Sequence, residues 1–68
     1  MATMYSIVVK GRLTDRLATS FEGMTIQTAD GTTILTGSVR DQSHLMGLLQ
    51  TIASLGLELI SAAPHSRS

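Results

Sequence analysis

The sequence predicts an α+β domain in which four antiparallel strands form one sheet and two helices cover one of its faces. One observation is a pair of alternating β-branched runs on either side of Asp30-Gly31, a dipeptide typical of tight hairpin turns. The other is that a strand-like run at each end of the chain is joined to this hairpin by a segment of helical periodicity. The resulting order is βαββαβ, the ferredoxin-like arrangement. The right-handed crossover rule places the first and third strands at the centre of this sheet.

The first strand and helix are predicted from "MYSIVVKGRLTDRLATSFEG". Tyr5, Ile7 and Val9 alternate with polar or smaller residues, which predicts a strand over residues 4–10. Thr14 is a suitable N-cap, and Gly23 is a suitable terminator, so a helix of about two turns is expected between them.

The remaining elements follow the hairpin. Strands are expected over residues 24–28 and 32–39. Asp41 is expected to cap a second helix that ends at Gly56, and "LELIS" predicts the fourth strand. The 68 residues are expected to form one domain, with an ordered core over about residues 4–62 and a flexible tail over residues 63–68.

The size of the chain favours reinforcement by a partner. A domain this short buries only about 60% of the surface of its unfolded chain. The sequence has no cysteine, and its two histidines lie far apart, so neither a disulfide nor a metal site is expected and no cofactor is predicted. Association with a second chain is the remaining source of stability, and a homodimer is its simplest form.

Charge and composition argue against several classes of protein. Five Lys and Arg balance five Asp and Glu, and only Tyr5 and Phe21 are aromatic, so binding to nucleic acid is not expected. Apolar runs are too short to span a membrane, and "MATMYS" does not have the pattern of a signal peptide. The expected location is the cytoplasm.

Two surfaces are candidate interfaces. If the helices cover the face that carries Ile7, Val9 and Leu35, the opposite face of the sheet is left open in a monomer. The aliphatic residues on that open face are Met4, Val8, Ile34 and Ile60. The second candidate is an uncharged stripe of small residues on the second helix that includes Ser43 and Gly47; a glycine inside a helix costs about 1 kcal/mol relative to alanine.

The sequence contains no recognisable catalytic constellation. Cysteine is absent, neither His44 nor His65 has an evident orienting partner, and phosphate-binding glycine motifs are missing, so no enzymatic activity is predicted. The leading hypothesis is a non-enzymatic protein–protein interaction module that associates with itself through the open sheet face, or with another protein. The alternative is a small regulatory domain that binds a metabolite at a subunit boundary.

Stretches of the sequence resemble three groups of known proteins. "VVKGRLTDRL" followed by "ADGTTILTGSVRDQ" resembles acylphosphatase in the order of elements, although the second arginine of that family's phosphate loop and its catalytic asparagine have no counterpart here. "GLLQTIASLGLELIS" is similar to the helix–strand segment of ACT domains, which implies binding of an amino acid. The strings "GRL", "FEGMTI", "DGTTILTGSVRDQ" and "GLLQTIASLGLELIS" resemble short uncharacterised bacterial proteins of ferredoxin-like type, a resemblance that implies no activity.

Overall fold

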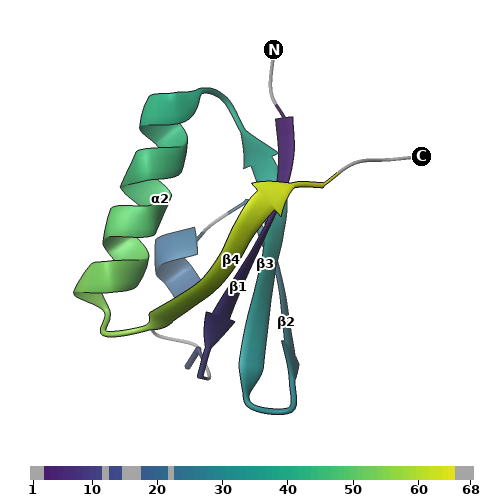
Figure 1. Cartoon of the computed structure of the whole chain (residues 1–68), viewed down its shortest axis with the longest axis vertical. Helices are drawn as coiled ribbons and strands as arrows, with labels where there is room; N and C mark the ends of the chain where they lie inside the picture. The colour runs from purple at the N-terminus through teal and green to yellow at the C-terminus, as the bar shows by residue number, and fades with distance from the viewer. Residues whose placement is uncertain (1–2, 12, 15–17, 22, 66–68) are drawn as a thin grey trace.

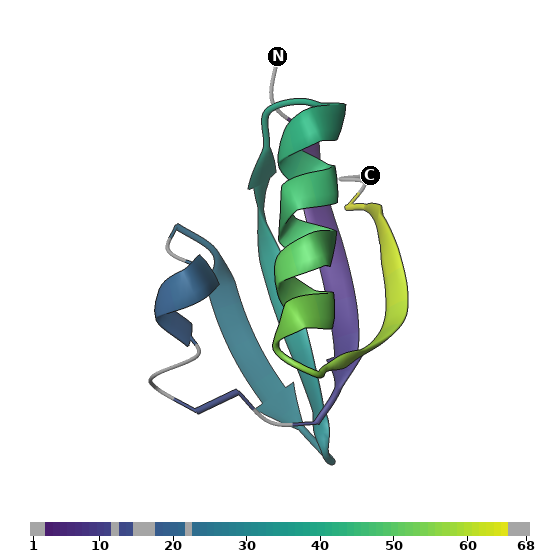
Figure 2. The same cartoon turned by 90° about the vertical axis from the view of Figure 1, so that its left-hand side faces the viewer.

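The fold is a two-layer arrangement of one sheet and one α-helix. The computed structural model describes residues 3–11, 13–14, 18–21 and 23–65. Along the chain the elements are β1 (Thr3–Lys10), the 3₁₀ turn η1 (Thr19–Phe21), β2 (Thr25–Ala29), β3 (Thr32–Val39), α2 (Gln42–Ser54) and β4 (Glu58–Pro64). The strands form a single antiparallel sheet in the order β2-β3-β1-β4, which confirms that the first and third strands are central. Helix α2 and η1 both lie on the same side of this sheet (Figures 1 and 2).

The core lies between α2 and the two central strands. Alternate residues of β1 and β3 point toward the helix, and Ile7 lies directly opposite Leu35 in the ladder. Ile52 of α2 packs on this pair, and the partly buried leucines of the helix surround it. The buried hydrophobic side chains are Ile7, Val9, Phe21, Leu35, Val39 and Ile52. The predicted inward faces of the first and third strands are therefore confirmed.

The start of α2 is fixed by reciprocal hydrogen bonds. The His44 backbone N–H donates to Oδ1 of Asp41 at 2.8 Å, which confirms the prediction that Asp41 is the N-cap. The Arg40 backbone N–H in turn donates to Nδ1 of His44 at 3.1 Å, which gives the histidine side chain a local structural role. The helix is followed by Gly56, whose φ of +77° is the left-handed conformation that ends many helices.

The β2–β3 hairpin forms as predicted. Asp30 and Gly31 have φ values of +50° and +79°, the conformation that a two-residue turn with primed geometry requires. The turn sets the register in which Ile26 lies opposite Leu35, so both contribute to the helix-covered face. The carbonyl of Gly31 also accepts a hydrogen bond from the N–H of Gly11 (2.7 Å), which ties the end of β1 to the hairpin.

The predicted ferredoxin-like βαββαβ fold is wrong, because α2 is the one α-helical element among the described residues. Where a first helix was expected, the Ala18 N–H donates to the carbonyl of Thr14 at 2.9 Å, and the chain then forms the 3₁₀ turn η1; residues 15–17 and 22 of the expected helix lie outside the described residues. The physical reason for the 3₁₀ turn at Thr19–Phe21 is that Phe21 is buried and the chain turns immediately afterwards toward β2. The Met24 N–H donates to the carbonyl of Phe21 at 3.1 Å, and Gly23 adopts a positive φ of +86°. A tight 3₁₀ turn meets that requirement in fewer residues than a helix does.

The last strand is longer than predicted. β4 runs to Pro64, and the His65 N–H donates to the carbonyl of Met4 at 2.6 Å, so residues 63–65 belong to the sheet and not to a tail. Residues 66–68 lie outside the described residues. β4 also carries a bulge: Leu59 is opposite Val9 and Ser61 is opposite Val8, which leaves Ile60 as the extra residue.

Gly37 is required by the packing of Met24. Gly37 is buried on the helix-covered face of β3, and a Cβ placed on it would lie 2.8 Å from Cγ and 3.2 Å from Cβ of Met24. The Met24 Cβ is close to its own backbone, so rotation of the side chain cannot fully relieve the overlap. We therefore interpret Gly37 as the residue that lets the start of β2 pack closely against β3.

We expect Gly37→Ala to lower the free energy of unfolding by about 1–3 kcal/mol, because the added methyl group overpacks the contact with Met24. Gly47→Ala is the matched control, since Gly47 lies on the exposed side of α2 and an added methyl group would have no neighbouring atom within 4 Å. It should stabilise the isolated chain by up to about 1 kcal/mol. Urea denaturation measures both values. Equal effects of the two substitutions would contradict the packing role of Gly37.

Candidate functional site

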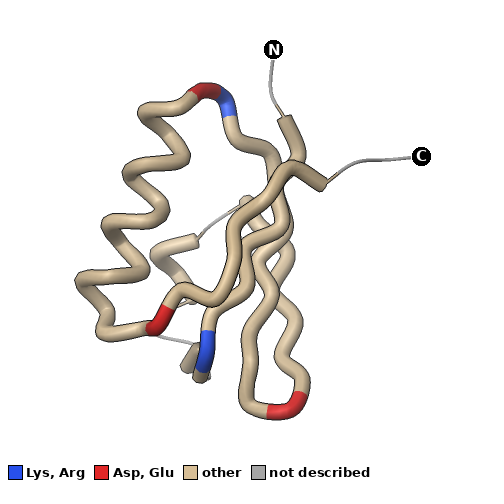
Figure 3. The backbone as a smooth tube through the Cα atoms, viewed as in Figure 1, with Lys and Arg blue, Asp and Glu red and all other residues tan. Residues whose placement is uncertain are grey.

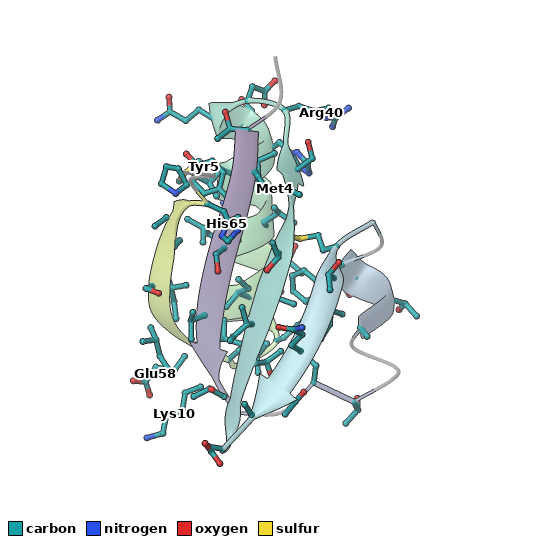
Figure 4. All side chains as sticks on the ribbon, turned by 90° about the vertical axis from the view of Figure 1, so that its right-hand side faces the viewer. Met4, Tyr5, Lys10, Arg40, Glu58 and His65 are labelled. Atoms are coloured by element: carbon teal, nitrogen blue, oxygen red, sulfur yellow. The ribbon has the colours of Figure 1, made fainter. Side chains whose placement is uncertain are left out.

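The face of the sheet opposite α2 is open. Side chains alternate along each strand, so the residues between the buried positions of β1 and β3 project to this side. No described helix or loop crosses in front of it when the sheet is viewed from that side (Figure 4). We call this surface the open face; its residues on the two central strands are Met4, Ser6, Val8 and Lys10, and Thr32, Ile34, Thr36 and Ser38.

An apolar row crosses the open face. Val8 of β1 and Ile34 of β3 lie directly opposite one another in the ladder, and both are partly buried by their neighbours. At the bulge of β4, Ile60 and Ser61 together oppose Val8, and Ile60 is 52% exposed. We define the apolar row as Ile34, Val8 and Ile60. Val8 and Ile34 are direct cross-strand neighbours, and Ile60 adjoins Ser61, the β4 partner of Val8, so the row extends over three neighbouring strands.

Met4, the fourth residue predicted for this surface, is not part of the row. It lies four residues before Val8 on the same strand, about 13 Å away along β1, opposite Ser38. Its side chain is 47% exposed. The structure therefore brings three of the four predicted sheet residues together and leaves Met4 at the far end of the face.

Polar rows lie on either side of the apolar row. Toward Met4 lies a hydroxyl row, formed by Thr25, Thr36 and Ser6 in register across β2, β3 and β1. Toward the hairpin lies a charged row, in which Lys10 of β1 is directly opposite Glu58 of β4 (Figure 4). The sequence did not reveal these rows, because they depend on the register between strands that are distant along the chain.

The described charges lie at the ends of the secondary-structure elements. Lys10 ends β1, Glu58 begins β4, Asp30 is in the hairpin turn, and Arg40 and Asp41 precede α2 (Figure 3). The middle of the open face and the whole of α2 therefore carry no Lys, Arg, Asp or Glu among the described residues. An uncharged centre with a polar rim is a property of protein–protein interfaces.

The second predicted patch lies on the other side of the domain. Ser43 and Gly47 are both exposed on α2, whose opposite side packs on the sheet (Figure 2). The Gly47 carbonyl accepts a hydrogen bond from the Thr51 hydroxyl at 2.9 Å, and no side chain of the described chain covers it. One partner surface cannot contact this patch and the open face at the same time, so the six predicted residues belong to two separate surfaces.

A hollow that sequence analysis did not identify lies where α2 begins. It has a volume of about 400 Å³. Its lining comes from the first strand, the end of the third strand and the first turn of the helix: Thr3, Tyr5, Val39, Arg40, Asp41, Gln42 and Leu45. Because the Asp41 carboxylate already accepts the His44 N–H, the helix N-terminus is partly neutralised and offers an anion little additional attraction.

Other kinds of site are not evident in the described part of the chain. Within it, no three His, Asp or Glu side chains come close enough together to hold a metal ion. The buried Thr33 side chain is satisfied, since its hydroxyl donates to the carbonyl of Gly11 at 2.8 Å. None of the helices in the described ranges is long and apolar enough to cross a membrane.

Fold and surface together define a small α+β domain with an uncovered antiparallel sheet face. Residues 4–63 match the model of a domain family of unknown function, DUF8691, and the chain belongs to that family. No curated protein and no solved structure matches it. The match fits the expected likeness to uncharacterised proteins, and it carries no activity with it.

The role of Asp41 as the N-cap of α2 can be tested by substitution. Asp41→Ala should lower the free energy of unfolding by about 1 kcal/mol, because the His44 N–H loses its acceptor. Asp41→Asn is the control, since an asparagine oxygen accepts the same bond, and it should remain close to the original stability. Thermal unfolding followed by circular dichroism measures the difference, and an Asn variant as unstable as the Ala variant would contradict a capping role.

Proposed function

We propose that this domain is a non-enzymatic interaction module that associates with a second copy of itself through the open face. The observation that carries the proposal is the apolar row of Ile34, Val8 and Ile60, which crosses a sheet face that α2 leaves uncovered. A partner that covers this contiguous apolar surface removes it from water, and that removal lowers the free energy. The absence of charge from the centre of the face adds support, since no ion has to lose its hydration when the face is covered.

The edges of the sheet are poorer candidates than its face. At the β4 edge, the bulge at Ile60 interrupts the alternation of backbone groups, and Pro64 has no N–H to donate. At the other edge, β2 has only five residues. Bulges, prolines and short edge strands are the features by which sheets avoid pairing with further strands. An added strand at either edge would thus form few regular hydrogen bonds.

The expected affinity is low. Covering a partly exposed aliphatic side chain stabilises an interface by about 1 kcal/mol, so the apolar rows of two copies contribute about 6 kcal/mol. Association costs at least about 4 kcal/mol in lost translational and rotational freedom. The balance of about 2 kcal/mol from the apolar rows alone corresponds to a dissociation constant of about 30 mM. A dimer that is populated below about 1 mM therefore needs about 2 kcal/mol more from the rest of the open face.

The alternative function is regulatory binding of a metabolite at a subunit boundary. The hollow at the start of α2 supports it, because its volume of about 400 Å³ is within the range of small-molecule sites. Tyr5, Arg40 and Gln42 would supply polar groups to such a ligand. The remaining expectations, a cytoplasmic location and no binding to nucleic acid or membrane, stay predictions from composition.

Self-association is tested by sedimentation equilibrium from about 10 μM to 1 mM. We expect the average mass to rise toward that of a dimer, and to depend only weakly on salt because the contact is apolar. Ile34→Lys should raise the dissociation constant by about tenfold or more, since it places an unpaired ammonium group at the centre of the contact.

Gln50→Lys is the matched control for this substitution. Gln50 is exposed on α2, on the side of the domain away from the open face, so the same charge is added outside the proposed contact. It should weaken association far less. A chain that remains strictly monomeric at about 1 mM would overturn the proposal.

The metabolite hypothesis is tested by thermal unfolding with amino acids and nucleotides. A ligand that binds only the folded state at 100 times its dissociation constant stabilises the fold by about 2.7 kcal/mol, which is a shift of several degrees for so small a domain. Tyr5→Phe and Arg40→Gln should reduce any shift that arises from the hollow. If no compound of either class shifts the midpoint, this alternative loses its support.

A further inference from the structure

We infer that the second copy packs face to face, with its apolar row directly on the apolar row of the first, across a two-fold axis that lies along this row. The inference rests on the proposed self-association and adds its geometry. A two-fold interface must be complementary to itself, because each copy presents the same surface. The arrangement of rows on the open face restricts how that condition can be met.

The restriction comes from the order of the three rows. The hydroxyl row and the charged row flank the apolar row on opposite sides, each about 7 Å from it along the strands. Any displacement by one row would place Ile34 and Val8 against either hydroxyls or the Lys10–Glu58 pair. Placing the apolar row on its own copy is the arrangement that removes aliphatic surface from water on both sides at once.

The direction of the axis follows from the charges. Rotation about an axis along the apolar row carries the charged row of one copy over the hydroxyl row of the other. Lys10 then approaches the level of Ser6 and Thr36 in the second copy, whose hydroxyl oxygens can accept its hydrogen bonds. Rotation about an axis along the strands would instead gather both Lys10–Glu58 pairs at one end of the interface. The first arrangement keeps the like charges of the two copies apart.

The size of the open face requires nearly complete overlap. β1 and β3 have eight residues each, which corresponds to a length of about 26 Å, and four strands span about 19 Å, so the face covers about 500 Å² in each copy. Two fully overlapping faces reach a total of about 1,000 Å², the lower limit for a specific interface. An axis displaced toward Met4 or toward the hairpin would bury less than this limit.

The absence of cysteine makes single-cysteine variants a direct test of this geometry. Packed sheets are about 10 Å apart, whereas a disulfide needs Cα atoms within about 7 Å. A cysteine on the axis should therefore react with its own copy through a bis-maleimide that spans about 10 Å, and not through a direct disulfide. Val8→Cys places the thiol on the axis, and it is a conservative change at a partly buried position.

Thr32→Cys is the matched control. Thr32 is on the open face of β3, one row from Ile34 toward the hairpin, so the rotation moves its copy two rows away. We expect Val8→Cys to be linked into covalent dimers at concentrations where the chain self-associates, and Thr32→Cys to remain monomeric under the same conditions. Circular dichroism of each variant verifies that it is folded.

The outcomes separate this inference from the proposed function. If sedimentation shows a dimer but Thr32→Cys is linked as well as Val8→Cys, or in place of it, the axis is elsewhere and the inference is wrong while self-association stands. A disulfide that forms without linker in Ala62→Cys would locate the contact at the β4 edge, and one in Gly47→Cys would locate it on α2. If no dimer forms at any concentration, both the inference and the proposed function fail.

Discussion

The pairing of β1 with β3 is the interaction on which the rest of the structure depends. These are the two longest strands, they pair over their full length, and they supply most of the buried side chains. Ile7 and Leu35 lie opposite one another at the centre of this pair, and Ile52 of α2 packs on them. Because β1 and β3 are far apart in the sequence, the loop-closure entropy of the fold is concentrated in this one contact. β2, β4 and α2 are then added by shorter connections on either side of it.

The same pairing creates the open face. Once one side of β1 and β3 is buried under α2, strand geometry forces the alternate residues to the opposite side, whatever their polarity. Val8 and Ile34 are thus brought together because Ile7 and Leu35 are buried next to them. None of the described elements other than the strands themselves lies on this side of the sheet. The exposure of the open face is a consequence of the fold, and its aliphatic content is the feature on which the proposed self-association rests.

The distribution of charge fits this view of the two layers. In the described chain the ionisable side chains other than histidine and tyrosine lie at strand ends, in the hairpin turn and before the helix, where they remain hydrated (Figure 3). Placed there, they solubilise the ends of the domain and leave its broad surfaces free of charge. Such surfaces have little electrostatic steering, so the proposed self-association would depend on shape and apolar area. The ladder of Thr and Ser beside the apolar row could supply hydrogen bonds at the rim without any desolvated ion.

Local sequence was sufficient where a few adjacent residues decide the conformation. Asp30-Gly31 determined the hairpin, Asp41 and Gly56 determined the limits of α2, and the alternation in β1 and β3 determined which side chains are buried. It was insufficient at Thr19–Phe21, where the chain forms a 3₁₀ turn because Phe21 is buried and the chain turns at once toward β2. Likewise Pro64 and its neighbours resembled a tail, yet pairing with β1 keeps them in the sheet.

The candidate interface residues were likewise predicted only in part from the sequence. The sequence by itself predicted, from the alternation along the strands, that Met4, Val8, Ile34 and Ile60 lie on the sheet face opposite the helix-covered one. Only the tertiary structure decided that three of them form one row, that Met4 lies apart, and that Ser43 and Gly47 face the other side of the domain. The physical reason is that polarity and alternation are properties of neighbouring residues, whereas register is set by contacts between strands that the chain brings together only when it folds.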